Sequence, residues 1–500
     1  MPSFTERYHE LTKYRPETID RLGDARWADQ PEPFKDVPEG RSIDLIPHLQ
    51  DVFKDVETPP DPLYPWLREA TLPTLTRLLH CTLGLTARLS SAGDSEGDFD
   101  MFLRAAPSAG GLYPTEVYVA VRKAPDIPAG LYHYHSRRSA LIPVWEGDFF
   151  ADLGHHFLGH PAVAAANCVI LFTGLYGRSA WRYKERAYRR ILLDTGHAAA
   201  NLLEMSAALG LDAVPLGGFI DEGLEELLFL GRKEECPLLG VAIGPGGSLG
   251  ASGGQWPGPL PERAVLRAEP GDSMQVQQNA CERIGPGDVG TLRPMVPVPG
   301  RGSAPPPAPD AGALAAFNTQ VAILARRSAR RFTGGMVTAH EAEDALRFAF
   351  RFPAAAVEAS TLLARGIVRY HVVAFAVEGL EDGVHEYDPD TGRMTLRREG
   401  DFRGDVHAVS LGQDLASDAA FAVVYTADME ALVSRYGDRG YRYACMDCGM
   451  VGERIQLWAG QRGLGSSGIG GYYDDLANEL LDLPLTHGVL YLTVVGVPED

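Results

Sequence analysis

Apolar residues recur along the chain with two different periods, and this alternation predicts a protein built from both helices and strands. A helical spacing occurs over residues 72–85 and again, in a longer run, from about 182 to 209. The longer run stops at Gly210, where a glycine is expected to end a helix. Alternating or β-branched apolar segments predict strands at residues 115–122, 167–173 and 238–243. The first half of the chain therefore predicts a domain that contains both helices and strands.

A similar order of elements returns in the second half of the chain. Helical spacing occurs over residues 314–325, 339–350 and 439–461, and strand-like segments occupy residues 368–377, 420–426 and 489–495. Between the two sets lies a segment dense in glycine and proline, which predicts a linker without regular structure. We therefore divide the chain into an irregular arm (1–65), a first domain (66–245), a linker (246–312) and a second domain (313–500).

The two halves are related by a constant offset of 253 positions. The identical pairs include Arg182 and Arg435, Tyr183 and Tyr436, Arg186 and Arg439, Arg189 and Arg442, Asp194 and Asp447, Gly196 and Gly449, Gly217 and Gly470, Gly218 and Gly471, and Asp221 and Asp474. Agreement of this extent without a gap predicts a duplicated domain.

The repeat fails at two short segments, and each half keeps the segment that the other has lost. Only the first half has the turn Pro107-Ser108-Ala109-Gly110-Gly111, and only the second has Arg326-Arg327-Ser328-Ala329-Arg330. Small residues let main-chain groups approach a flat ring system, so the turn can act as a backbone cradle. Two guanidinium groups and a hydroxyl can clamp one phosphate. We therefore predict that the two segments meet in space as one flavin mononucleotide (FMN) site.

Composition and charge favour a soluble chain with about two domains. Its 500 residues exceed the ~250–300 residues at which single cores stop growing. The net charge of −20 argues against nucleic acid or an anionic membrane as the main partner. The first residues lack the layout of a signal peptide, and no apolar run approaches the ~20 residues of a spanning helix. We expect a cytoplasmic protein.

Three motifs resemble metal sites but have simpler interpretations. Cys445 and Cys448 fall in a helical pattern with no second pair, so buried thiols are expected. The pair His155-His156 has no carboxylate at a suitable spacing, which favours an exposed helix. Residues 388–392, Asp-Pro-Asp-Thr-Gly, predict a hairpin turn. No metal site is therefore expected.

Several of these segments resemble the nitroreductase superfamily, and in particular its SagB/ThcOx-type dehydrogenase branch. The matching stretches are residues 8–13 (Tyr-His-Glu-Leu-Thr-Lys), 107–114 (Pro-Ser-Ala-Gly-Gly-Leu-Tyr-Pro), 130–134, 186–189, 193–197, 217–219, 326–332 and 468–472. The resemblance implies α+β domains with mixed, mostly antiparallel sheets flanked by helices, which pair around FMN. This chain would then be an intramolecular pseudo-dimer of two fused nitroreductase-like domains, with one composite site kept and one lost.

The resemblance also implies a role for each candidate residue of the composite site. Arg326, Ser328 and Arg330 would bind the phosphate, the backbone of Pro107, Ser108, Ala109 and Gly110 would line the isoalloxazine ring, and the backbone around Gly470 and Gly471 would reach flavin N5. The alternative interpretation of the double glycine is a helix-to-loop turn.

The catalytic pair expected from the resemblance is altered in this chain. Dehydrogenases of this branch carry a Lys-Tyr pair at the start of the long helix, and the corresponding residues here are Arg182 and Tyr183. Because arginine stays protonated, we expect Tyr183 to be the acid/base group and Arg182 to lower the pKa of its phenol. The alternative is that the pair only starts the helix, as its copy Arg435-Tyr436 suggests.

The resulting functional interpretation is an FMN-dependent dehydrogenase that oxidises a C–N or C–C bond in a biosynthetic intermediate. The substrate would be a small molecule or a peptide-derived compound such as an azoline, and biosynthetic enzymes would be its partners. Two alternatives stay open. The protein could be an NAD(P)H-dependent reductase of nitro compounds or quinones, or a flavin-free scaffold that binds a partner enzyme.

Overall fold

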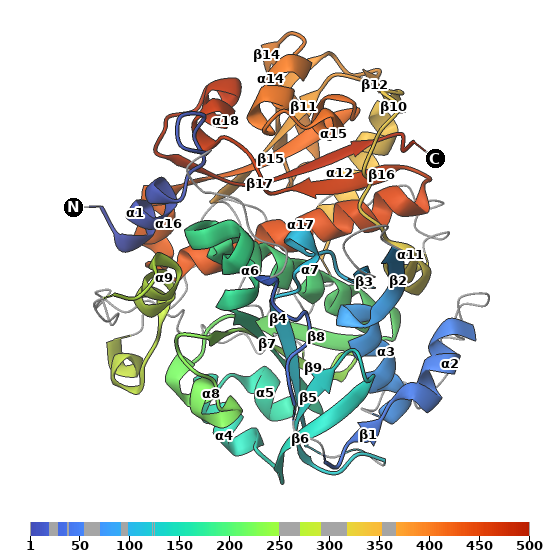
Figure 1. Cartoon of the computed structure of the whole chain (residues 1–500), viewed down its shortest axis with the longest axis vertical. Helices are drawn as coiled ribbons and strands as arrows, with labels where there is room; N and C mark the ends of the chain where they lie inside the picture. The colour runs from blue at the N-terminus through green and yellow to red at the C-terminus, as the bar shows by residue number, and fades with distance from the viewer. Residues whose placement is uncertain are drawn as a thin grey trace.

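The computed structural model consists of two α+β domains, one below the other in Figure 1, joined by two long helices that run across the middle. It describes residues 2–19, 29–37, 40–54, 71–91, 99–122, 124, 126–249, 271–291, 318–352 and 367–499. The remaining parts of the predicted arm and linker, and residues 314–317 of a predicted helix, lie outside the described residues.

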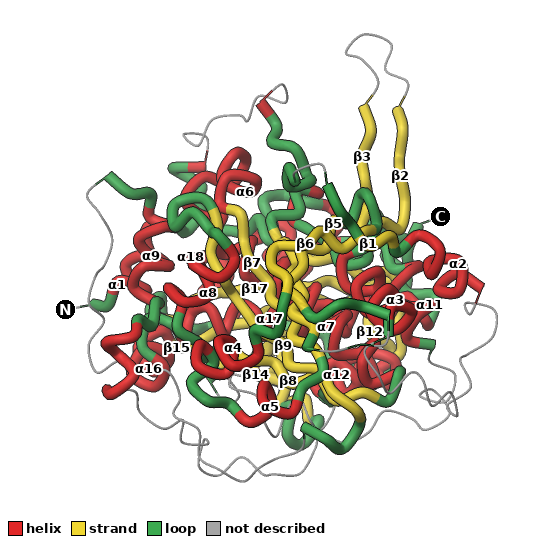
Figure 2. Tube along the Cα trace, turned by 90° about the horizontal axis from the view of Figure 1, so that it is seen from below, coloured by secondary structure: helices red, strands yellow, loops and turns green. Residues whose placement is uncertain are grey.

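The first domain is built on a seven-stranded antiparallel sheet with the strand order β1-β6-β5-β4-β7-β9-β8. Its strands are β1 (Ile43–Asp44), β4 (Thr115–Val121), β5 (Gly130–His135), β6 (Ala140–Glu146), β7 (Cys168–Leu175), β8 (Leu211–Leu216) and β9 (Glu235–Pro245). Its helices are α2 (Ile46–Lys54), α3 (Leu72–Leu83), η4 (Ala109–Gly111), α4 (Phe150–His156), α5 (Pro161–Ala165), α6 (Tyr176–Tyr183), η5 (Lys184–Arg186), α7 (Ala187–Ala208) and α8 (Asp221–Leu228). Strands β2 (Leu85–Ser91) and β3 (Phe99–Arg104) form a separate hairpin, which projects from the body of the molecule in Figure 2.

The second domain repeats this arrangement. Its six-stranded antiparallel sheet has the order β14-β13-β11-β15-β17-β16, which matches β6-β5-β4-β7-β9-β8 strand for strand. The strands are β11 (Val368–Ala374), β13 (Gly383–Asp388), β14 (Arg393–Glu399), β15 (Phe421–Asp428), β16 (Gly465–Ile469) and β17 (His487–Gly496), with the short parallel pair β10 (Val337–Thr338) and β12 (Val377–Glu378) beside them. The helices are α11 (Thr319–Ala325), α12 (Ala339–Phe350), α14 (Arg403–Val409), α15 (Asp414–Ser417), α16 (Met429–Tyr436), α17 (Gly440–Gln461) and α18 (Asp474–Leu481). The predicted duplication is therefore confirmed.

Helices α7 and α17 pack against each other and join the domains (Figure 1). They cross at two glycines that occupy equivalent positions in the repeat. A Cβ atom on Gly196 would lie 2.2 Å from the carbonyl oxygen of Met446, and one on Gly449 would lie 2.2 Å from that of Leu193. Any side chain at either position would push the helices apart, because backbone atoms cannot yield. The crossing therefore marks the approximate two-fold axis of an intramolecular pseudo-dimer.

Helix α1 (Phe4–Leu11) and helix α9 (Met274–Glu282) have equivalent roles at opposite junctions between the domains. Just after α1, the amide of Tyr14 donates to the carboxylate of Asp474, 3.0 Å away. Just after α9, the amide of Ile284 donates to the carboxylate of Asp221, 2.8 Å away. Because Asp221 and Asp474 are a matched pair of the repeat, the second structural repeat begins before α9.

Two predictions about the elements are wrong. Residues 246–312 were expected to lack regular structure, yet they contain α9 and η6 (Pro286–Thr291). Helix α9 starts at Ser273, whose hydroxyl accepts a hydrogen bond from the amide of Val276 and so satisfies a free donor of the first turn. The predicted long helix is broken at Lys184, which has a positive φ of 49° and separates α6 from α7. Arg182 and Tyr183 consequently end α6 and do not start the long helix.

The motifs interpreted as structural have the expected surroundings. Cys445 and Cys448 are buried free thiols in α17. His155 and His156 form the last turn of α4. Residues 388–392 make the turn between β13 and β14, where the amide of Gly392 donates to the carbonyl oxygen of Asp388. Within the described ranges, no group of three or more potential metal ligands is present.

Candidate functional site

The two predicted half-sites lie next to each other where the domains meet. Arg326, which follows α11, donates from Nε to the carbonyl oxygen of Ala105 at 3.0 Å. Arg327 donates to the carbonyl oxygen of Thr86 at 3.2 Å. Ala105 precedes Pro107 by only two positions. The predicted meeting of the two segments is therefore present.

Arg326 is a buried link between the domains as well as a candidate phosphate ligand. Its Nη1 donates to Gln456 Oε1 at 3.2 Å, and its Nε lies 3.5 Å from Glu453 Oε1. Ser328 is half-buried beside it, and Arg330 is exposed. The segment thus presents two exposed arginines, Arg327 and Arg330, and one half-buried hydroxyl next to a buried guanidinium. The binding of a phosphate by these three residues stays a prediction.

Asp194 on α7 holds the turn of residues 107–111 in place. Its carboxylate accepts from the hydroxyl of Ser108 at 2.5 Å and from the amide of Ala109 at 3.2 Å. Burial raises the pKa of Asp194 to about 6, although these two hydrogen bonds act in the opposite direction. The Ser108 hydroxyl is therefore used to fix the turn. Pro107, Ser108 and Ala109 are half-buried residues, and Gly110 is exposed.

Tyr183 lies directly over this turn. A Cβ atom on Gly110, which has a φ of 65°, would lie 2.9 Å from the hydroxyl oxygen of Tyr183 and 3.4 Å from Cδ of Arg182. Burial raises the pKa of Tyr183, and the guanidinium groups of Arg190 and Arg182 offset only part of that increase. Arg182 does lower the pKa of Tyr183, as predicted, but burial raises it by more. The expected net pKa below the ordinary value is therefore wrong, because the exposed arginine does not replace the hydration that the half-buried phenol loses.

Arg190 on α7 is a residue of this site that the sequence interpretation missed. Its side chain is 2% exposed, and Nη1 and Nη2 have no hydrogen-bond partner within the described part of the chain. Its Cζ lies 5.3 Å from the centre of the Tyr183 ring. A Cβ atom on Gly470 would lie 2.1 Å from Nη1 of Arg190, so the first residue of the double glycine must lack a side chain. Arg190 thus packs between Tyr183 of one domain and Gly470 of the other.

The sequence did hold a signal for Arg190, because the repeat places Tyr443 at the equivalent position. Several neighbouring positions of the repeat are identical, but this one holds an arginine in the first half and a tyrosine in the second. This difference distinguishes the two junctions between the domains. We call the first the Tyr183 junction, defined by residues 107–111, Tyr183, Arg190 and Gly470. The second is the Tyr443 junction, defined by Gly217, Tyr436 and Tyr443.

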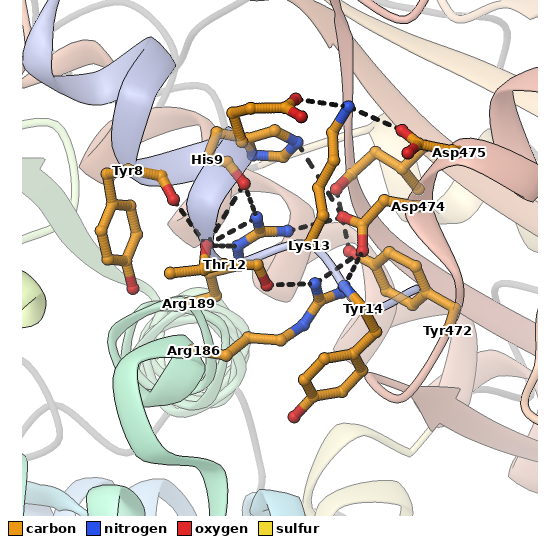
Figure 3. A network of polar contacts seen from close by, with 12 residues as sticks. Tyr8, His9, Thr12, Lys13, Tyr14, Arg186, Arg189, Tyr472, Asp474 and Asp475 are labelled. Carbon is orange, nitrogen blue, oxygen red and sulfur yellow. Dashed lines mark hydrogen bonds and ion pairs between the residues drawn. The ribbon is translucent and has the colours of Figure 1, made fainter. Parts of the chain in front are cut away.

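A buried ionic cluster supports the Tyr183 junction, and Figure 3 shows it from close by. Asp474 accepts from Arg186 Nη1 at 2.6 Å and from Arg189 Nη1 at 2.8 Å. Arg189 also donates to the hydroxyl of Thr12 and to the carbonyl oxygen of His9, so the N-terminal arm closes the cluster. Burial alone would raise the pKa of Asp474, but the two guanidinium groups hold it below its usual range. The cluster fixes the start of α18, just after the double glycine.

The Tyr443 junction has the matching cluster but is filled by its own side chains. Asp221 pairs with Arg439 at 2.6 Å and with Arg442 at 3.2 Å. The hydroxyl of Tyr443 donates to the carbonyl oxygen of Gly217 at 3.1 Å, and Arg439 donates to the same oxygen at 2.8 Å. Gly217 and Tyr443 are buried. The carbonyl oxygen of Gly217 and the hydroxyl of Tyr443 are therefore already bonded within the protein.

The residues of the Tyr183 junction fit a flat, anionic cofactor. The backbone of the turn is accessible, the two glycines at 470 and 471 are half-buried, and Arg330 and Arg182 bring positive charge to the surface. The buried, unpaired Nη atoms of Arg190 add charge beneath this surface. Glycines at positions 110 and 470 leave no side chain between these groups. By contrast, Gly217 of the Tyr443 junction is buried and is covered by Tyr443, so its backbone is not accessible to a cofactor.

Comparison with known proteins identifies the class to which this fold and site belong. The model of the nitroreductase family matches the chain twice, over residues 71–245 and 323–497. The chain therefore belongs to the nitroreductase family, a family of oxidoreductases that generally bind FMN, and carries the family domain in tandem.

Individual relatives support this assignment, and they align with different shares of the chain. MJ1384 of Methanocaldococcus jannaschii, a nitroreductase by name, is 30% identical over 174 residues, which are 35% of this chain and 80% of that protein. McbC of Escherichia coli, a microcin B17-processing protein, is 28% identical over 146 residues, which are 27% of this chain and only 52% of McbC. A crystal structure of a nitroreductase-like protein from Anabaena variabilis matches over 100% of both chains, with a TM-score of 0.80 and 32% identity. The tandem architecture therefore also occurs in a solved structure.

Among the described residues, no helix is both long and apolar enough to cross a bilayer.

Proposed function

We propose that the chain is an FMN-dependent dehydrogenase with one cofactor site, located at the Tyr183 junction. One observation carries the proposal. The turn of residues 107–111, the segment of Arg326, Tyr183 and the double glycine converge at this junction, whereas Tyr443 and Arg439 occupy the equivalent place at the other.

The cofactor would be held by groups from both domains. Arg326, Ser328 and Arg330 would bind the phosphate through charge-assisted hydrogen bonds. The main chain of Pro107 to Gly110 would face the ring system, and the backbone around Gly470 and Gly471 would reach its N5 side. Bound FMN would supply hydride transfer. The proposal thus requires both domains for one site.

Tyr183 would hold or transfer the proton that accompanies hydride transfer. Its hydroxyl lies beside the turn that would face the ring, on the side from which a substrate could approach the exposed Gly110. Oxidation of a C–N or C–C single bond releases one hydride and one proton, so a phenolate at this position could accept the proton. Arg182 and Arg190 provide the positive charge that favours the phenolate.

The similarity to McbC favours a peptide-derived substrate such as an azoline, delivered by biosynthetic partner enzymes. A second candidate, NAD(P)H-dependent reduction of nitro compounds or quinones, is favoured by a different observation. Because burial raises the pKa of Tyr183, the phenol is neutral near pH 7 and suited to donate a proton to a reduced product.

Anaerobic reduction of the purified protein tests the proposal and separates the two directions. The protein should show the absorbance of oxidised flavin, and an azoline-containing peptide should bleach it while forming the corresponding azole. Bleaching by NAD(P)H alone would instead support the reductase. A colourless protein that binds no added FMN would contradict both and leave the flavin-free scaffold.

A further inference from the structure

We propose that Arg190 is a positioning residue for Tyr183, whose guanidinium supplies the buried positive charge that stabilises the phenolate form of this tyrosine. The proposal rests on the assignment of Tyr183 as the proton-transfer group. It replaces the sequence-based expectation that Arg182 has this role, and it deepens the proposed function without changing the substrate class.

The geometry around Arg190 suits this role. Its guanidinium carbon lies 5.3 Å from the centre of the Tyr183 ring, and that of Arg182 lies 5.9 Å away. Arg190 is 2% exposed, whereas Arg182 is exposed. A charge in a water-poor environment acts more strongly on a neighbour than one screened by solvent. Arg190 is therefore the more effective of the two cations.

Arg190 also lacks the bonds that normally hold a buried arginine. Both Nη atoms have no hydrogen-bond partner within the described ranges. By contrast, the nearby arginines Arg186 and Arg189 form ion pairs with Asp474 at 2.6 Å and 2.8 Å. Burying a guanidinium whose Nη atoms make no hydrogen bond costs stability, and the charge interaction with Asp194 offsets only part of that cost. The place of Arg190 between Tyr183 and Gly470 therefore suggests a role besides folding. The close packing against Gly470 keeps the guanidinium from turning away.

The repeat provides an internal comparison. At the Tyr443 junction the position of Arg190 is taken by Tyr443, whose ring lies 6.2 Å from that of Tyr436 in an edge-on arrangement. Tyr436 is 4% exposed and has no access to a ligand, whereas Tyr183 is half-buried at the accessible turn. Arg435 lies 5.5 Å from the centre of the Tyr436 ring, as its counterpart Arg182 lies near Tyr183. The difference between the two junctions is therefore the second, buried cation Arg190, which is present only beside Tyr183.

Burial raises the pKa of Tyr183 most, and four nearby groups adjust it further. Arg182 comes from its own helix, Arg190 and Asp194 from α7, and Tyr14 from the N-terminal arm. Asp194 and Tyr14 oppose ionisation, and the two arginines favour it. Without Arg190, only the solvent-screened Arg182 would lower the pKa of Tyr183, while Asp194 and Tyr14 would still raise it.

Fluorine NMR of the full chain with a fluorinated tyrosine placed at position 183 tests the proposal. Fluorination lowers the phenol pKa and brings its titration into the range where the protein stays folded, and the signal reports this tyrosine alone. Arg190→Gln should raise the pKa of residue 183 by about one unit or more, the shift expected for losing an opposite charge within a few ångströms. Arg182→Gln, the matched control, should raise it by less, and Arg190→Lys should stay close to the parent protein.

If the pKa of residue 183 rises no more in Arg190→Gln than in Arg182→Gln, the proposal is overturned. Arg190→Met serves as a second uncharged variant, because methionine is also a long side chain, and it should raise the pKa of residue 183 in the same way. The titration needs neither flavin nor substrate, so a protein without flavin activity would refute the proposed function and leave this result interpretable. In the flavin-loaded protein, the pH profile of kcat should move with the measured pKa, while KM stays nearly constant. A change in KM alone would assign Arg190 to packing.

Discussion

Replacing Asp474 by asparagine should destabilise the fold and weaken cofactor binding, whereas the matched Asp221→Asn should only destabilise. Asp474 is fully buried and pairs with Arg186 at 2.6 Å and with Arg189 at 2.8 Å. Removing its charge leaves two buried guanidinium groups without a counter-ion. Breaking a buried ion pair from one side costs about 3–5 kcal/mol of unfolding free energy, and we expect a loss in this range for Asp474→Asn. The loss for Asp221→Asn should be smaller, because Glu282 still pairs with Arg442 at 2.9 Å.

The pH dependence of the effect has a definite sign. The pKa of Asp474 lies below its usual range in the folded protein, so its contribution to stability is fully present above the ordinary value of ~3.9. That contribution is lost as the pH falls through the folded-state pKa. The difference in stability between the parent protein and Asp474→Asn should therefore be constant near neutral pH and shrink only in strong acid.

Urea denaturation of the FMN-loaded proteins, followed by circular dichroism and by flavin release, measures both effects. Asp474→Asn should release FMN well before global unfolding, since the cluster fixes the chain just after Gly470 and Gly471. Asp221→Asn should release FMN only as it unfolds. Equal retention of FMN by the two variants, or a loss of stability below about 1 kcal/mol in both, would refute this account of the clusters.

Three further predictions concern single residues of the Tyr183 junction. Arg330→Ala should weaken FMN binding by more than about 1 kcal/mol through loss of a charge-assisted bond, with little change in stability because Arg330 is exposed; equilibrium dialysis would show it, and unchanged affinity would place the phosphate elsewhere. Because the pKa of Asp194 is raised to about 6, the folded protein binds more protons than the unfolded chain between about pH 4 and pH 6, and stability should fall as the pH rises through that window. Asp194→Asn should flatten that part of the stability profile, and an unchanged slope would assign it to other groups. Tyr183→Phe should keep the fold and FMN but lower turnover by roughly 10²-fold or more, and near-normal turnover would make Tyr183 structural.

The fold could be predicted from the sequence where periodicity is sustained or repeated. The buried helix α17 and strands such as β4, β7 and β15 follow the expected apolar patterns, and the matched residues predicted the duplication. The break at Lys184 could not be predicted, because no glycine or proline marks a positive φ there. Helix α9 was missed since its surroundings are rich in glycine and proline, although Ser273 is a good N-cap.

The site could be predicted only in part, because sequence spacing shows which segments are candidates and not what surrounds each side chain. The turn at residues 107–111 and Arg326 were identified through the complementary losses of the repeat, and Arg326 contacts Ala105, two positions before the turn. The burial of Tyr183, which decides the direction of its pKa shift, depends on tertiary packing of α6 against α7 and the turn of residues 107–111. Arg190 was missed for the same reason, since an arginine within a helical pattern is usually a solvated residue.

The central claim is that the chain binds one FMN between its two domains, at the Tyr183 junction. Release of flavin from protein saturated with FMN, quantified against the concentration of the chain, tests this claim most directly. The account predicts one FMN per chain, and Tyr443→Ala should not create a second site because the Tyr443 junction lacks an Arg326-like segment in the first half of the chain. Two flavins per chain, or none under saturating FMN, would contradict it.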